Sequence, residues 1–415
     1  MLLPSTREAL MPHSVILGSF GGDNAGDLLV LESILGLIRS QDSSARFTIP
    51  IPRRSDASVR VAGNDIHWIQ SPEYRLGLRF SGSGVRLALR TADSVILTAG
   101  IIFDERLWHP TSNFLTSLHC LIVRSRWRAR LGLQRADPMW IGFGIGIPPA
   151  SSYLGAKLMR RVVSSLDLVI ARDARSARRA IELGLAPERV VPGVDAIWNP
   201  GMRRNDFVSN DLGRDRELQP VLRSSRSETE PGRIGLNVNR YFSPVIGRSR
   251  RGFAYKALVD WVREKGLVAE WFCTSVGDEK VAEDLNRKMT SPLAIRGLST
   301  ETHWDLMARA TGYDAMVGSR LHASLLALSR GVPALAVPYR QKVTDTFESL
   351  GLGDLVVLPE DFNPSTVVPV LKRCLEEPDL HERITQARTK AEALFLRQSS
   401  KLLDVFDGPS HAQSS

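Results

Sequence analysis

Short apolar runs alternate with segments whose apolar residues recur at helical spacing along most of the chain. Residues 15–17 and 95–97 have the length and composition of strands that are buried on both faces of a sheet. Residues 28–39 follow the first of these strands and have the period of a helix. Such alternation predicts parallel α/β architecture, in which helices cover both faces of each sheet.

The alternation is interrupted once, by a polar segment at residues 203–233 that has no apolar period. Before it, we expect strands at 15–17, 95–97, 140–143, 168–170 and 190–191, with helices at 28–39 and 174–183. After it, we expect strands at 234–238, 270–274, 315–317 and 334–337, with helices at 255–265, 278–288, 301–309, 321–329 and 382–406. This order predicts two Rossmann-like domains facing a central cleft, at residues 1–202 and 234–402, joined by a linker or long loop at 203–233 and followed by a flexible tail at 403–415.

The length and composition agree with two domains. A chain of 415 residues exceeds the usual size of one hydrophobic core, and 43% hydrophobic with 24% charged residues is ordinary for a globular protein. The net charge is +9, with Arg outnumbering Lys, and three explanations stay open: anionic ligands, an anionic membrane surface or a compositional bias. The chain has no zinc-finger, basic-zipper or RNA-recognition signature, so we expect no nucleic-acid partner.

Metal and membrane signals are sparse. The cysteines lie far apart at Cys120, Cys273 and Cys374, and no residues have the spacing of metal ligands. No apolar run approaches the roughly 18 residues that span a bilayer, and the N-terminus lacks a leader pattern. We therefore expect a cytoplasmic protein without a bound metal.

One segment could still bring the chain to a membrane. Residues 120–133 combine an apolar stripe at helical spacing with four flanking arginines. Such a helix could rest on the anionic inner face of a bilayer, which would make the protein peripheral there. The interpretation that we favour is a helix packed on its own domain with solvated arginines.

The most informative segment is Ser319, Arg320, Leu321, His322 and Ala323, at the expected start of a helix. The N–H groups and the dipole of a helix start attract anions. Arginine offers a planar fork for a carboxylate or phosphate, and histidine exchanges a proton near neutral pH. This segment could hold an anionic substrate and protonate it, or it could be a structural helix start.

A glycine-rich loop joins the first expected strand to the first helix and contains Asn24, Gly26 and Asp27. Its glycines allow the backbone to approach a ligand closely, although the spacing is not that of the dinucleotide-binding fingerprint. Asp27 could bind a sugar hydroxyl or act as a base. Equally, Asp23 or Asp27 could cap the helix.

Two further arginines follow expected strands. Arg172 precedes Asp173, which we expect to cap the next helix, and Arg240 is the expected second-domain partner of Arg320. For each arginine alone, a surface ion pair is the alternative.

Taken in order, these segments resemble the polysaccharide pyruvyl transferase family over residues 14–351. The resemblance rests on the loop with Asn24 to Asp27, the turn at residues 144–146, and Arg172 with Asp173 and Ser176. It continues through the strand ending near Arg240, the segment Arg320 to His322, residues 331–333, and Tyr339 with Lys342. A departure is Ala99-Gly100 where the family often has consecutive glycines.

The resemblance implies a two-domain fold like that of the GT-B glycosyltransferases. It implies transfer of a pyruvyl group from phosphoenolpyruvate to a sugar of a polysaccharide or lipid-linked oligosaccharide, forming a ketal without a cofactor. The donor would bind the second domain and the acceptor the first. The implied site has His322 as acid and Asp27 as base, with substrate contacts from Arg320, Leu321, Arg240, Arg172, Asn24, Gly26 and Lys342.

Two other functions stay open. A GT-B glycosyltransferase that uses a nucleotide-sugar would share the fold. A non-enzymatic, membrane-associated scaffold for polysaccharide assembly would need no tight site for a small anion. The acceptor sugar and the oligomeric state are not determined by these patterns.

Overall fold

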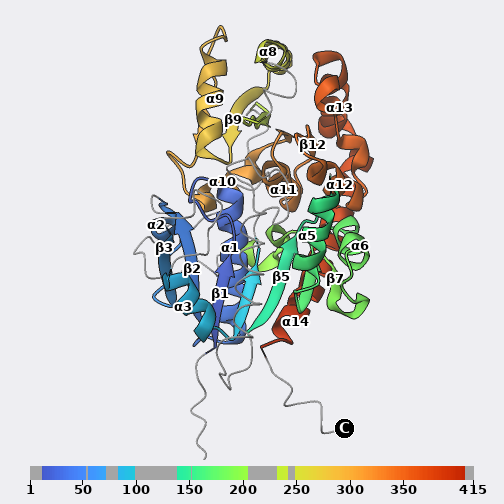
Figure 1. The fold of residues 1–415 in the computed structure, drawn as a ribbon. Coiled ribbons are helices and arrows are strands. Elements are labelled where there is room, and N and C mark those ends of the chain that lie inside the picture. Colours follow the sequence, from blue (N-terminus) through green and yellow to red (C-terminus); the bar gives the residue numbers. More distant parts are fainter. Residues whose placement is uncertain are drawn as a thin grey trace, which may run out of the picture.

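The computed structural model describes residues 12–52, 55–71, 83–98, 138–150, 152–203, 231–241 and 248–406. These residues form two α/β domains, each built on a parallel sheet and placed end to end (Figure 1). The predicted fold class is confirmed. The segment 120–133, residues 204–230 of the expected linker, and the chain after residue 406 lie outside the described residues.

The first domain is built on a parallel sheet of seven strands. The strands are β1 (His13–Leu17), β2 (Arg46–Pro52), β3 (Ile66–Ser71), β4 (Ser94–Leu97), β5 (Met139–Ile145), β6 (Leu168–Ala171) and β7 (Val190–Pro192). Their order across the sheet is β3-β2-β1-β4-β5-β6-β7. The helices are α1 (Ala25–Gln41), α2 (Ala57–Arg60), α3 (Ser83–Thr91), α5 (Tyr153–Val163) and α6 (Ala174–Glu182), with short 3-10 turns η2 (Pro187–Arg189), η3 (Ala196–Trp198) and η4 (Pro200–Arg203).

The second domain is built on a smaller parallel sheet of five strands. The strands are β8 (Arg233–Leu236), β9 (Val268–Cys273), β10 (Ile295–Gly297), β11 (Ala315–Gly318) and β12 (Ala334–Ala336), in the order β10-β9-β8-β11-β12. The helices are α8 (Arg248–Glu264), α9 (Val276–Asn286), α10 (His303–Arg309), α11 (Leu321–Ser329), α12 (Gln341–Ser349), α13 (Pro364–Glu376) and α14 (Pro378–Leu403), with 3-10 turns η7 (Ala310–Gly312), η8 (Gly353–Leu355) and η9 (Pro359–Asp361).

The strands of the first sheet are buried on both faces, as their apolar composition predicts. Val15 and Leu17 pack in a cluster with residues of α3, α5 and α6, whereas Ile16 packs in a second cluster with α1. Successive side chains of a strand point to opposite faces, so one short apolar run supplies both clusters. This explains why strands such as β1 contain few polar residues.

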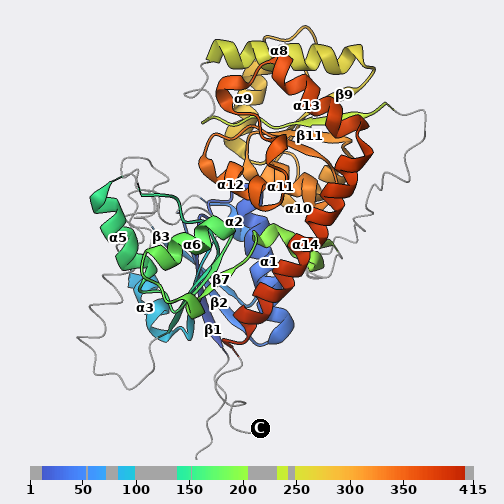
Figure 2. The ribbon, with the colours of Figure 1, turned by 90° about the vertical axis from the view of Figure 1, so that its right-hand side faces the viewer.

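The last helix connects the two domains. Figure 2 shows α14 running from the second domain down along the first. Near its end, Phe395 packs edge-to-face on Phe143 of β5, with ring centroids 6.4 Å apart. Gln398 is fully buried and binds the backbone of Val194 twice: its Oε1 accepts from the N–H at 2.7 Å and its Nε2 donates to the carbonyl at 3.1 Å.

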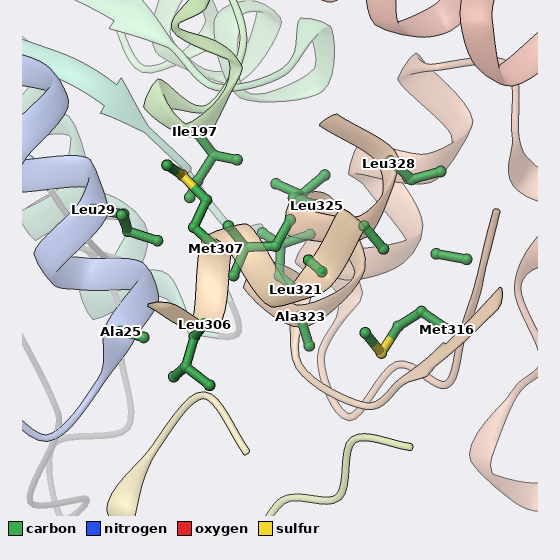
Figure 3. Packing of buried hydrophobic residues seen from close by; sticks show 14 of the residues in the cluster. Ala25, Leu29, Ile197, Leu306, Met307, Met316, Leu321, Ala323, Leu325 and Leu328 are labelled. Carbon is green, nitrogen blue, oxygen red and sulfur yellow. The ribbon is translucent and has the colours of Figure 1, made fainter. Parts of the chain in front are cut away.

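Apolar side chains from both domains pack together behind the cleft. Figure 3 shows Ala25 and Leu29 of α1 beside Leu306 and Met307 of α10, with Ile197 of η3 nearby. All of these side chains are at least nine-tenths buried. Burial of apolar surface between the domains therefore stabilises their mutual placement.

The strands β2 and β3 are missing from the sequence-based expectation. β2 contains Pro50 and Pro52, and prolines are usual signs against an inner strand. In the structure, β2 pairs with β1 only as far as Thr48, so both prolines lie where β2 pairs with β3 alone. Because proline has no N–H group, these two residues could not donate to β1, and their position leaves the hydrogen bonds between β1 and β2 intact.

Candidate active site

The carboxyl ends of the two sheets face each other, and backbone hydrogen bonds join the loops that follow β1 and β9. The N–H of Ala25 donates to the carbonyl of Thr274 at 2.8 Å, and the N–H of Val276 donates to that of Asp23 at 3.1 Å. The starts of α1 and α9 are therefore held together across the domain boundary. Because parallel α/β sheets bind ligands at their carboxyl ends, this boundary is the candidate site.

The start of α1 is capped by Asn24. Its Oδ1 accepts from the N–H of Gly26 at 3.1 Å, and its Nδ2 donates to Oδ2 of Asp27 at 2.9 Å. The alternative that Asp23 or Asp27 caps this helix is wrong. Asn24, expected from the sequence to contact substrate, uses both polar groups to build the helix start and to orient Asp27.

Asp27 lies in the first turn of α1, close to charged residues of the second domain. Burial raises its pKa above the ordinary value, and the positive charges of His322, Lys342 and Arg320 oppose that shift. A carboxylate with a raised pKa is a better proton acceptor at neutral pH than an exposed one. The position suits a general base.

His322 is the second residue of α11 and lies directly against α1. A Cβ atom added to Gly26 would stand 1.9 Å from Nδ1 of His322, so only glycine permits this contact. On its other side, Nε2 of His322 lies 3.6 Å from Oδ2 of Asp195, and the two side chains are 12% and 5% exposed. The imidazole thus belongs to the second domain, while both of these neighbours belong to the first.

Asp195 was not among the residues expected from the sequence to form the site. It follows β7 and caps η3, accepting from the N–H of Ile197 at 3.1 Å. Burial raises its pKa, but the neighbouring His322 and Arg172 outweigh that effect, and the pKa falls below the ordinary value. Asp195 is therefore ionised at neutral pH. Its place after a strand of the first sheet was the signal that could have revealed it.

Arg320, at the N-cap position of α11, binds a carboxylate of its own domain. Its Nε and Nη2 both donate to Asp278, the latter at 2.8 Å, and its backbone N–H donates to Oδ1 of Asn237 at 2.9 Å. Asp278 is fully buried. Burial alone would lower the pKa of Arg320, but the charge of Asp278 and its hydrogen bonds outweigh burial and raise that pKa above its ordinary value. Asp278 was also absent from the sequence-based expectation.

Leu321 does not present its side chain to the cleft. The side chain is 2% exposed and lies in the apolar cluster behind the site (Figure 3). The expected contact of Leu321 with substrate therefore does not involve its side chain. Its apolar character anchors the helix start that carries Arg320 and His322.

Arg240 lies where expected, beside Arg320 after β8. Its guanidinium stands 4.8 Å above the ring of Tyr241, and that of Arg320 stands 5.9 Å from the same ring. Tyr241 in turn stacks on Tyr339, with ring centroids 6.0 Å apart. Cations over aromatic faces are attracted by the ring quadrupole. Arg240 is exposed, so its guanidinium can reach a ligand in the cleft.

Arg172 follows β6 directly, and its side chain is only 4% exposed. Within the described part of the chain, its Nε has no hydrogen-bond partner, and Asp173 is 3.9 Å away. Asp173 caps α6 as expected, accepting from the N–H of Ser176 at 2.7 Å. The Nη2 of Arg172 lies against Gly146, where an added Cβ would approach to 2.3 Å. A buried guanidinium without a full set of partners favours an anionic ligand.

Lys342, in the first turn of α12, faces the same region from the second domain. Burial lowers its pKa; Tyr339 and Asp27 favour the charged ammonium, while Arg172 and Arg340 disfavour it. Burial raises the pKa of Tyr339, but Lys342, Arg320 and Arg340 outweigh it and hold that pKa below the ordinary value. Positive charge therefore dominates this side of the cleft.

Three helix starts of the second domain reinforce that charge. α9, α11 and α12 each follow a strand of the second sheet, and none of their N-cap residues makes a side-chain capping bond. For α11 and α12 the N-cap residue is an arginine, Arg320 and Arg340. Serine, threonine, aspartate and asparagine are preferred there, and a cation at the positive end of a helix dipole is unfavourable. A bound anion would be attracted by the positive ends of these helices and by the charges of both arginines.

The fold and site together define a class. Two parallel-sheet domains that enclose a cleft at their carboxyl ends form a GT-B-type α/β protein. The chain belongs to the polysaccharide pyruvyl transferase family, which matches residues 24–341. Membership makes it a transferase that acts in polysaccharide modification.

A curated relative agrees with this family. The amylovoran biosynthesis protein AmsJ of Erwinia amylovora is 22% identical over 316 residues, which cover 73% of this chain and 69% of AmsJ. Its name refers to synthesis of a polysaccharide, in line with the family.

Solved structures share the fold. The UDP-GlcNAc 2-epimerase of Neisseria meningitidis is 11% identical, with a TM-score of 0.59 over 95% of this chain and 99% of that chain. The calicheamicin glycosyltransferase CalG4 is also 11% identical, with a TM-score of 0.52 over 96% and 99% of the two chains. At this identity the likeness concerns the fold alone.

Proposed function

We propose that this protein transfers the pyruvyl group of phosphoenolpyruvate to two hydroxyl groups of one sugar, forming a cyclic ketal and releasing phosphate. One observation carries the proposal: the uncapped starts of α9, α11 and α12 meet around cationic side chains on the donor side of the cleft. Phosphoenolpyruvate carries a carboxylate and a phosphate on a small skeleton. A site where several cations converge on the positive ends of helices suits such a donor.

The donor would lie on the second domain. Arg240 and Arg320 offer guanidinium groups beside Tyr241, and Lys342 approaches from α12. Two nitrogens of Arg320 already bind Asp278, which holds the guanidinium in place. Arg320 would therefore contribute to donor binding by a positive charge in a fixed position and by the backbone of its helix start. Arg172 would reach the same anion from the first domain.

The reaction would begin with a proton from His322 to the methylene carbon, giving a methyl group and an oxocarbenium-like centre at C2. A sugar hydroxyl attacks C2 and loses its proton to Asp27. The C2–O bond to phosphate then breaks, and the second hydroxyl closes the ketal as its proton leaves with the base or phosphate. The net change is donor plus diol to ketal plus phosphate. Acid–base assistance of this kind is worth roughly 10²–10⁴-fold in rate.

The acceptor would be a sugar of a polysaccharide or of a lipid-linked oligosaccharide, bound mainly by the first domain. A lipid-linked acceptor would bring the enzyme to the inner face of a membrane. No helix in the described ranges is both long and apolar enough to cross a bilayer.

Phosphate release from phosphoenolpyruvate tests the function. Purified protein is incubated with the donor and with oligosaccharides that offer neighbouring hydroxyl groups, and the product is examined by NMR for the methyl singlet of a ketal. We expect acceptor-dependent phosphate release with that signal. Release of a nucleotide from nucleotide-sugars instead, with no binding of phosphoenolpyruvate by calorimetry, would show a glycosyltransferase. Neither activity, without a tight site for small anions, would favour a scaffold.

A further inference from the structure

Asp195 and His322 form a pair that exists only when the two domains are together. Asp195 precedes η3 of the first domain, and His322 lies in the first turn of α11 of the second. Nε2 of the imidazole is 3.6 Å from Oδ2 of Asp195. The other oxygen, Oδ1, accepts from the N–H of Ile197 at 3.1 Å. One carboxylate therefore uses one oxygen to hold its own loop and turns the other to the histidine.

The loop that carries Asp195 is held rigidly. The amide of Gln398 binds both the N–H and the carbonyl of Val194, at 2.7 and 3.1 Å. The N–H of Gly193 donates to the carbonyl of Ala171 at 2.9 Å. Precise support of this kind is what a side chain needs to orient a reacting group.

The opposite edge of the ring is the one beside α1. Among the imidazole atoms, Nδ1 is nearest to the position that a Cβ of Gly26 would take, at 1.9 Å. This part of the ring therefore packs against the backbone of α1 at Gly26. Asp27 lies one residue further along α1, with its charge felt by His322.

We infer that Asp195 is a positioning residue whose carboxylate orients the imidazole of His322 through Nε2 and stabilises the protonated ring for proton transfer to the substrate. This inference rests on the proposed function. In the charged imidazolium both nitrogens carry protons, and the carboxylate of Asp195 stabilises that form.

Charged groups surround this pair from every element packed against it. Asp27 lies on α1, Arg320 begins α11 itself, and Lys342 lies on α12 next to Asp27. Arg172, at the end of β6, acts on Asp195 and favours its ionised form. The carboxylate of Asp195 therefore keeps its charge throughout the neutral pH range, in which the imidazole must give up and regain a proton in each turnover.

The test uses the full chain labelled with ¹⁵N-histidine, and NMR of the ring nitrogens as a function of pH, with His322→Gln identifying the signal. Asp195→Asn keeps an oxygen for the N–H of Ile197 but removes the charge. The response of its His322 signal to pH should differ from that of the native protein, because the protonated ring loses the carboxylate beside it. Turnover should fall about 10²-fold or more, with the KM for phosphoenolpyruvate within about threefold.

Asp173→Asn is the matched control, because Asp173 is a buried N-cap carboxylate of the same sheet that faces Arg172. It should leave the titration of His322 in place. Should Asp195→Asn not fold, Asp195→Ser can cap η3 by its hydroxyl and gives the same test. A His322 signal with the native response to pH in either Asp195 variant would overturn the inference. If native protein releases no phosphate from phosphoenolpyruvate but the titration shifts as expected, the proposed function fails and the pairing of Asp195 with His322 stands.

Discussion

Gly26 and His322 touch across the domain boundary, so closely that a Cβ at position 26 would stand 1.9 Å from Nδ1 of the imidazole. The contact joins the first turn of α1 to the first turn of α11. Two helix starts, one from each domain, therefore meet at the residue that we propose as the acid. Small changes at this point test how the site is assembled.

Gly26→Ala should displace His322, because neither the helix backbone nor the ring edge can yield by the required distance. A misplacement of about 1 Å at a reacting group can cost about 10²-fold in rate. We expect that loss in kcat, measured by phosphate release, while the far-UV circular dichroism stays native. Gly277→Ala is the control: its Cβ would meet Arg240 at 3.4 Å, an ordinary contact at the same cleft. Equal activity of both variants would exclude a close Gly26–His322 contact in solution.

Arg320→Ala should destabilise the second domain as well as weaken donor binding. Asp278 is fully buried and bound by two nitrogens of Arg320, so the variant leaves a buried carboxylate without its partner. Breaking such a pair costs about 3–5 kcal/mol. Urea unfolding should show this loss.

Replacing both partners separates stability from binding. Arg320→Gln with Asp278→Asn leaves no buried charge, so we expect most of the stability back. Calorimetry with phosphoenolpyruvate should still show weaker binding. Native stability in Arg320→Ala would contradict the buried pair, and native donor affinity in the double variant would remove Arg320 from the donor site.

Donor binding at alkaline pH should take up protons at Lys342. Burial lowers the pKa of this ammonium, so part of it is neutral in the free protein at pH below its ordinary range. An anion beside it favours the charged form and raises the pKa again. Titration calorimetry at pH 9 in buffers of different ionisation enthalpy measures the uptake. Lys342→Met should abolish it, and identical proton uptake in that variant would place the anion elsewhere.

Asp354 forms ion pairs with two arginines, and the stability that these pairs contribute depends on pH. Its carboxylate binds Arg383 and Arg373, and the hydrogen bond from Arg383 is the main reason that its pKa falls to about 2. The pKa in the unfolded chain is higher, near 3.8, so the contribution is complete above about pH 4 and is lost as the pH falls toward 2.

Asp354→Asn therefore tests this contact. The side chain is 39% exposed, so solvent screening limits its value to about 1 kcal/mol or less. Asp354→Asn should be slightly less stable at pH 7 in urea unfolding, and the difference should shrink as the pH falls below 4. A difference that grows toward acid would contradict the assigned direction.

The sequence predicts a site residue when its position after a strand brings it to the site, but not when its role depends on a partner far away in the chain. Arg320, His322, Asp27, Arg240, Arg172 and Lys342 all lie where two sheet ends meet, because each follows a strand that the apolar pattern predicts. Asp195 and Asp278 could not be recognised in this way. Asp195 matters because of His322, which is over 120 residues away in the chain. Asp278 matters because of Arg320, which is more than 40 residues away. Pairing at such separations is decided by packing.

The alternation of apolar runs and helical periods determined two parallel sheets, since each short run must be covered on both faces. It also determined which loops would reach the cleft, because strands of one parallel sheet share a carboxyl edge. Only the tertiary structure decided that Leu321 faces the core, that Asn24 caps α1, and that Arg320 is bound to a buried carboxylate. The physical reason is that local patterns fix the period and the end of an element, whereas the partners of a buried polar group are set by the element packed against it.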